Sequence, residues 1–146
     1  FHLYFAGDGE ELFNLQELST SSNLEKDVSF LKHLSAENMH AFYRSMDVIV
    51  LPSSHEAFGL VFIEAISLGT PVIVSSQFGV LSFLKEKEEN ISQFTFNPES
   101  KAELVEKLRL YLSHEGLTKS YFKQLYHDNF NKDVIFKEIL NMIAPG

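Results

Sequence analysis

The chain has 146 residues, of which 45% are hydrophobic and 22% are charged, a composition typical of one folded domain with a sizeable core. Its net charge of −8 comes without any offsetting basic run, which argues against nucleic-acid binding by phosphate neutralisation. The absence of cysteine excludes disulfides, thiolate metal sites and a cysteine nucleophile. No uninterrupted apolar stretch approaches the roughly 20 residues that a membrane-spanning helix needs, so we expect no membrane span.

Strand and helix patterns alternate along the chain almost to its end. In chain order we predict a strand over 1–6, a helix over 10–18, a strand over 28–31, a helix capped by Ser35, a strand over 47–51, a helix over 59–68, a strand over 71–74, a short helix over 80–85, a weak strand over 93–96, and helices over 101–112, 117–129 and 132–143. Apolar residues run without alternation through 48–51 and 72–74, which is typical of strands buried on both faces.

This alternation predicts an α/β fold, with a Rossmann-like, mostly parallel sheet covered by helices on both faces. Polar residues 19–23 predict a loop. In parallel sheets the ligand crevice lies outside the carboxyl ends of the strands. The loops that follow Ala6, Leu31, Leu51 and Val74 are therefore the places to search for a site.

Positions 57–84 contain a single charged residue, Glu64. Its neighbours along the predicted helix are apolar, and an ionised carboxylate in such surroundings costs several kcal/mol unless donors meet it. We therefore expect Glu64 to face solvent or a crevice, or to bind something specific. In a helix it lies one turn after Leu60, near the helix N-terminus and the crevice after Leu51.

The start of the same helix suits an anion. Residues 58–61 would offer free backbone N–H groups, Gly59 permits close approach, and the helix dipole favours negative charge. With Glu56 just before the helix, this arrangement would suit a nucleotide-sugar. Phosphates would sit on the N–H groups, Glu64 would accept from a cis-diol, and Glu56 would face the sugar. The ordinary alternative, a solvated surface glutamate at position 64, stays open on spacing alone.

Residues 52–65 (PSSHEAFGLVFIEA) and 68–74 (LGTPVIV) closely resemble the signature of family-4 retaining glycosyltransferases. Glu56 and Glu64 match the E-x7-E motif of that family. Residues 5–9 resemble the glycine-rich turn of its C-terminal domain, and the resemblance covers roughly 1–112.

The resemblance implies the two-domain GT-B architecture, in which a Rossmann-like C-terminal domain binds the donor. Residues 1–146 would be this domain, truncated at its N-terminus, with the N-terminal acceptor domain absent. The function implied is transfer of a sugar from a nucleotide-diphospho-sugar to a glycan or lipid-linked acceptor, with retention of configuration, in polysaccharide or glycoconjugate biosynthesis. The isolated chain would be inactive. The expected location is cytoplasmic, with peripheral attachment at the inner face of the membrane left open.

By the same resemblance, Glu56 would be catalytic, contacting the donor sugar or steadying charge at its anomeric carbon, and Glu64 would bind the ribose hydroxyls. Gly7 would pass close to the donor, and His33, in the segment 32–34, would flank the base. The diphosphate and neighbouring sugar groups would be held by the backbone of Phe58, Gly59, Leu60 and Val61. Neither a metal nor another cofactor is expected, and the six histidines lack a metal spacing.

Three departures from the family pattern bear on function. The Arg and Lys that neutralise the diphosphate follow the family's first strand, upstream of this chain. The turn after the second buried strand has Phe78 and Ser82 where the family has a glycine and an acidic residue. The charged run 85–90 replaces a glycine-rich stretch.

The altered turn keeps an alternative open, a non-catalytic nucleotide-sugar-binding or interaction module of degenerate GT-B fold. A nucleotide-sugar epimerase or phosphorylase is a third reading, for which we identify no pyridoxal-type lysine or acid–base pair. An aromatic platform for bases or acceptor sugars, at Phe58 or Phe78, is a further option. Homodimerisation of the isolated domain is an option through the apolar stripe of the last helix, Val134, Ile135, Ile139, Leu140 and Ile143.

Overall fold

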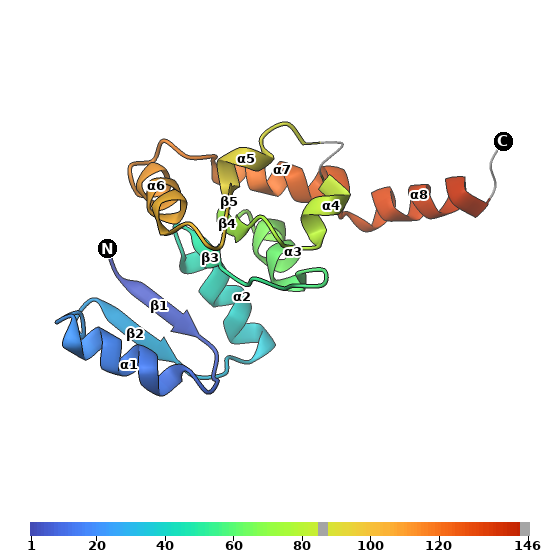
Figure 1. Cartoon of the computed structure of the whole chain (residues 1–146). Coiled ribbons are helices and arrows are strands. Elements are labelled where there is room, and N and C mark those ends of the chain that lie inside the picture. Colours follow the sequence, from blue (N-terminus) through green and yellow to red (C-terminus); the bar gives the residue numbers. More distant parts are fainter. Residues whose placement is uncertain (85–87, 144–146) are drawn as a thin grey trace. The chain divides into compact units, whose positions relative to one another are not determined.

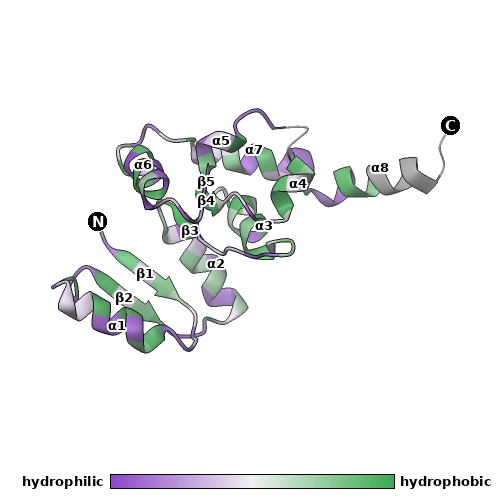
Figure 2. Ribbon diagram, viewed as in Figure 1, coloured by the Kyte–Doolittle hydropathy of each residue, from purple (hydrophilic) through white to green (hydrophobic). Residues whose placement is uncertain are grey.

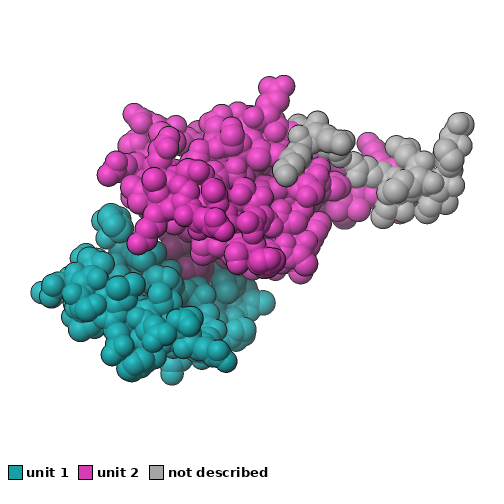
Figure 3. Space-filling view, in the orientation of Figure 1, with its two compact units in different colours: residues 1–41 teal, residues 42–146 magenta. Residues whose placement is uncertain are grey.

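The computed structural model describes residues 1–84 and 88–143. By its internal contacts the chain divides into two compact units, unit 1 (residues 1–41) and unit 2 (residues 42–146), which are coloured separately in Figure 3. That the 146 residues form one domain, as the chain length suggests, stays a prediction.

Unit 1 is a strand–helix–strand unit. It contains β1 (Leu3–Ala6), α1 (Leu12–Ser21), β2 (Val28–Leu31) and the first part of α2 (Ala36–Ser45), which continues into unit 2. The two strands are parallel, in register from Leu3 opposite Val28 to Ala6 opposite Leu31, and α1 makes the crossover between them (Figure 1). Hydrophilic and hydrophobic segments alternate along α1 (Figure 2), as expected of a helix with one face toward a sheet.

Unit 2 is built on a three-stranded parallel sheet in the order β3-β4-β5. Its elements after α2 are β3 (Ile49–Leu51), α3 (Leu60–Ser67), β4 (Val72–Ser75), α4 (Val80–Leu84), α5 (Ile91–Phe94), β5 (Thr95–Phe96), α6 (Lys101–Leu112), α7 (Lys119–Asn129) and α8 (Lys132–Ile143). Among the residues described, no helix is both long and apolar enough to cross a membrane.

The two apolar strands of unit 2 differ in burial. All four residues of β4, the central strand, are buried, as predicted for Val72, Ile73 and Val74; the strand also includes Ser75, beyond the predicted end. The three residues of β3 are only half-buried, so the prediction that both faces of this strand are buried is wrong. The reason is sheet order: β3 is an edge strand of the three-stranded sheet, and this position cannot be recognised from a run of apolar residues.

A cluster of phenylalanines fixes α3, the helix of the E-x7-E segment. The ring of Phe62 on α3 is completely buried, with its centroid 6.2 Å from that of Phe94 and 6.5 Å from that of Phe130. Phe94 in turn lies 5.7 Å from Phe122 on α7, the helix that packs against α3. Burying each ring contributes about 1.5–3 kcal/mol. The start of α3 is therefore held on a well-packed core.

Several predicted boundaries need correction. The helix α1 continues to Ser21, although a loop was predicted from residue 19, because Ser19 is buried and its carbonyl accepts from Leu24 N at 2.9 Å. Residues 93–94 belong to the helical turn α5, where the predicted strand would place them extended, and Thr95 Oγ1 closes that turn on the carbonyl of Ile91 at 3.0 Å. The predicted cap by Ser35 is confirmed, since its Oγ accepts from Asn38 N at 3.3 Å.

Other ends agree closely with the expectation. The strand over 28–31 and the helices over 101–112 and 132–143 have the predicted bounds. The helix predicted from 117 begins at Lys119, because Thr118 caps it by accepting from Tyr121 N at 3.2 Å. The charged run predicted to replace a glycine-rich stretch lies partly outside the described residues, which omit 85–87.

Candidate functional site

The loops that follow β3 and β4 meet at the carboxyl edge of the sheet in unit 2. Glu56 and Phe78 form a parallel β-bridge between these loops. Gly79 N donates to the carbonyl of Glu56 at 2.9 Å, and Val80 N donates to the carbonyl of Phe58 at 3.0 Å. The segment before α3 is thus attached to the turn before α4, at the edge where parallel sheets bind their ligands.

Two glycines allow this close approach. Gly59, the residue before α3, has φ +91°, and an added Cβ would lie 2.6 Å from Cδ1 of Phe78. A Cβ on Gly79 would fall on the carbonyl of Ala57. Phe78 is 5% exposed and packs against Gly59, so an exposed aromatic platform at Phe78 is excluded. Phe58 is 46% exposed.

Glu56 places a carboxylate on the N-terminus of α3. Its Oε1 accepts from Gly59 N at 3.1 Å and from Phe58 N at 3.4 Å. Two of the N–H groups predicted to hold phosphate are therefore occupied by an anion of the chain itself, in the place that the helix dipole favours. Among the described residues, none accepts a hydrogen bond from Leu60 N or Val61 N.

Glu64 lies one turn further along α3 and is exposed, as expected for a charged residue among apolar neighbours. Its Oε2 accepts a hydrogen bond of 3.1 Å from the hydroxyl of Tyr43, a residue at the end of α2 that is only 2% exposed. Burial, the hydrogen bond to Glu64 and the negative charge of Glu64 together raise the pKa of Tyr43 to about 12, and burial has the largest effect.

Sequence reasoning missed Tyr43 as a site residue. Its spacing placed it among the apolar residues of α2, and that placement is correct for its ring. A hydroxyl that reaches a carboxylate 21 residues further along the chain leaves no local pattern.

The structure brings six of the eight predicted site residues together at one helix start. These six are Glu56, Phe58, Gly59, Leu60, Val61 and Glu64. The other two, Gly7 and His33, belong to unit 1. There the loops after β1 and β2 begin side by side, since Gly7 N donates to the carbonyl of Leu31 at 3.1 Å. Gly7 has φ +131°, and His33 is exposed.

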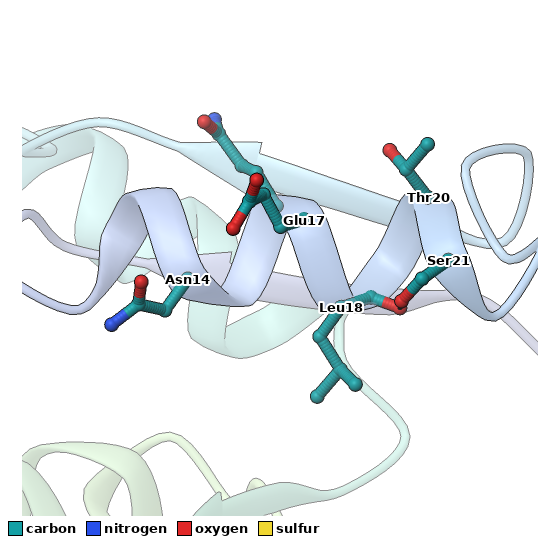
Figure 4. A pocket seen from close by; sticks show the side chains of 6 residues that line it. Asn14, Glu17, Leu18, Thr20 and Ser21 are labelled. Carbon is teal, nitrogen blue, oxygen red and sulfur yellow. The ribbon is translucent and has the colours of Figure 1, made fainter.

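Two surface hollows are lined by none of the predicted site residues. One is lined only by residues of α1, namely Asn14, Gln16, Glu17, Leu18, Thr20 and Ser21, whose side chains come from a single helix and do not converge (Figure 4). The other follows α6 and the residues just after it. Within the described ranges, no group of three or more His, Asp or Glu side chains could hold a metal ion.

Comparison with known proteins places the chain in a family. The sequence model of the glycosyl transferases group 1 family matches residues 1–127, beyond the 112 residues over which the resemblance was traced. An uncharacterized glycosyltransferase of Methanocaldococcus jannaschii is 34% identical over 142 residues, which is 97% of this chain and 34% of that protein. The sulfoquinovosyl transferase of Arabidopsis thaliana is 35% identical over 108 residues, covering 74% of this chain and 20% of its own length.

Solved structures support the fold. Anabaena HepE, crystallised with UDP-glucose, superposes with a TM-score of 0.78 at 21% identity, covering 99% of this chain and 41% of HepE. The predicted α/β fold, with parallel strands alternating with helices, is confirmed and matches part of GT-B glycosyltransferase structures. The chain spans about a third or less of the two curated relatives. By these comparisons, the chain belongs to the glycosyl transferases group 1 family.

Proposed function

We propose that the chain is the donor-binding part of a retaining glycosyltransferase, which transfers a sugar from a nucleotide-diphospho-sugar to a glycan or lipid-linked acceptor. The N-terminus of α3 carries this proposal. Its first N–H groups already bind the carboxylate of Glu56, the next two are free of described acceptors, and Glu64 presents a second carboxylate one turn later. Family membership supports the choice of a nucleotide-sugar as ligand.

The diphosphate, the ribose and the sugar of the donor each bind a different group of this segment. The diphosphate takes the N–H groups of Leu60 and Val61, and those of Phe58 and Gly59 once Glu56 has turned away. Glu64 accepts from the two ribose hydroxyls, each bond contributing about 1.5–3 kcal/mol. Two anions do not share one helix terminus, so arrival of the diphosphate drives the Glu56 carboxylate from Gly59 N toward the sugar, where it steadies positive charge at the anomeric carbon.

The E-x7-E segment itself brings no lysine or arginine to the phosphates. Positions 45–84 contain no Lys or Arg, so within this range the phosphates have the backbone N–H groups and the helix dipole to meet their charge. We propose that basic side chains from a longer protein, together with its acceptor domain, complete the site without a metal. That the chain spans 34% of its Methanocaldococcus jannaschii relative supports a larger protein.

For the donor base, uridine is the first choice to test, because the Anabaena HepE structure holds UDP-glucose. Guanosine remains the second choice. In unit 1, Gly7 and His33 are the residues proposed to meet the donor and its base, and the loop conformation at Gly7 N supports a close backbone approach there.

A second candidate is a non-catalytic nucleotide-sugar-binding module. It is favoured by the turn after β4, where Phe78 fills the space beside Gly59 and Ser82 stands where the family has an acidic residue. Transfer of sugar by the intact protein would exclude it. Binding of a nucleotide-sugar with neither transfer nor hydrolysis would favour it.

The binding half of the proposal is tested by titrating UDP, GDP and ADP into the intact protein that carries this sequence, by calorimetry or ligand-observed NMR. We expect one nucleotide to bind and the Glu64→Ala variant to lose at least about tenfold in affinity, since it removes two charged hydrogen bonds. Glu106→Ala, an exposed glutamate on α6, is the matched control and should bind as the unchanged protein does. Equal affinities for Glu64→Ala and the control would refute the assignment of Glu64.

A further inference from the structure

We propose that Tyr43 is a positioning residue for the nucleotide, because its hydroxyl holds the carboxylate of Glu64 in the orientation that meets the ribose. This inference rests on the proposed function and adds to it a residue outside the E-x7-E segment. The observation behind it is the hydrogen bond of 3.1 Å from the Tyr43 hydroxyl to Glu64 Oε2.

Both the backbone and the side chain of Tyr43 form hydrogen bonds with α3 or with the loop that follows it. Its carbonyl oxygen accepts from Oγ1 of the buried Thr70 at 2.8 Å, and Thr70 N donates to the carbonyl of Ala65 on α3 at 3.0 Å. Its hydroxyl then reaches Glu64 on that helix. The hydrogen bond from Thr70 to the Tyr43 carbonyl and the burial of the ring hold Tyr43 in place independently of the hydroxyl. The hydroxyl bond is therefore free to serve the orientation of Glu64.

The bond leaves Glu64 able to accept more hydrogen bonds. A carboxylate has about four lone-pair sites, and one tyrosine hydroxyl uses one of them. Oε1 and the second lone pair of Oε2 remain for two ribose hydroxyls. Since the pKa of Tyr43 is raised to about 12, its hydroxyl keeps the proton throughout the neutral range and is a permanent donor.

Orientation matters here because Glu64 is exposed. An exposed glutamate samples several rotamers, and a ligand that needs one of them must restrict the others on binding. A fixed donor restricts them beforehand, which improves affinity by preorganisation. Without the hydroxyl, Glu64 still binds the ribose, but more weakly.

The test compares Tyr43→Phe with the unchanged intact protein. This variant keeps the buried ring and removes only the hydroxyl. The probes are the nucleoside diphosphate that binds among UDP, GDP and ADP, and its 2′-deoxy form. We expect Tyr43→Phe to raise the Kd of the ribonucleotide about three- to tenfold and to reduce the preference for ribose over 2′-deoxyribose. In a Glu64→Ala background, the same change should alter Kd less than about twofold.

Tyr111→Phe is the matched control, because Tyr111 is also buried, at 7% exposure, but lies on α6. It should change neither Kd nor the ribose preference. Equal weakening of both nucleotides by Tyr43→Phe, with the ribose preference intact, would assign Tyr43 a purely structural role and overturn the inference. The inference would also be overturned if Glu64→Ala weakened binding while Tyr43→Phe left the Kd unchanged. The proposed function would then stand. If no diphosphate binds the unchanged protein, the proposed function fails and the inference fails with it.

Discussion

Replacing Gly59 by alanine tests the packing that sets the start of α3. Gly59 has φ +91°, where an L-residue is destabilised by about 1–2 kcal/mol. The new Cβ would also lie 2.6 Å and 2.9 Å from two carbons of the Phe78 ring, an overpacking that costs about 1–3 kcal/mol. The two effects together predict a loss of about 2–5 kcal/mol in the free energy of unfolding.

The assay is urea unfolding followed by circular dichroism, with Gly69→Ala as the comparison in the same unit. Gly69 has φ +78°, but its nearest neighbour, the Lys119 carbonyl oxygen, would be 3.1 Å from an added Cβ. We expect Gly59→Ala to cost at least about 1 kcal/mol more than Gly69→Ala, and to cost less when Phe78 is also replaced by alanine. Equal losses at the two glycines, or simple additivity with Phe78→Ala, would refute the claim that Phe78 packs against Gly59.

Three further predictions concern Glu56, the tyrosines and the core. Glu56→Gln keeps an acceptor for Gly59 N but removes the negative charge. In the intact enzyme it should therefore slow sugar transfer at least about 100-fold, as measured by kinetics. It should change the free energy of unfolding by less than about 1 kcal/mol. Tyr43 keeps its proton to about pH 12 while the unfolded chain releases it near 10, so stability should fall as pH rises between these values, and less steeply in Tyr43→Phe. Burial raises the pKa of Tyr111 and Tyr121 as well, which adds to this fall in denaturant titrations at alkaline pH. Phe122→Ala removes a completely buried ring next to Phe94 and should cost about 3–5 kcal/mol on unfolding.

Elements with marked ends could be predicted from the sequence. The helix over 101–112 has its expected bounds because Ser100 caps it, accepting from Glu103 N at 3.3 Å. The exposure of β3 could not be predicted in this way, since its apolar run resembles that of β4 and only the strand order separates an edge strand from a central one. Local sequence signals therefore predict where helices and strands lie, whereas the burial of a strand depends on its neighbours in the sheet.

In the candidate site too, features with a local sequence signal could be predicted, whereas those that depend on tertiary contacts could not. Glu64 is identifiable as the lone charge among apolar residues, and Gly59 as a helix start, because both signals are local. That Glu56 already occupies the N–H groups of Phe58 and Gly59 could not be seen from spacing, which predicted these groups as free. The hydroxyl of Tyr43 comes from another helix, so its contact depends on tertiary packing.

The central claim is that a nucleoside diphosphate binds at the N-terminus of α3. Its most direct test is a titration of UDP, and then of GDP, into the isotope-labelled intact protein, with the backbone amide signals followed by NMR. The account predicts the largest shifts at the amides of Leu60 and Val61, accompanied by shifts at Phe58 and Gly59 as Glu56 leaves them. Saturable binding that shifts the amides of α1 or α6 and leaves those of residues 58–61 unchanged would contradict it.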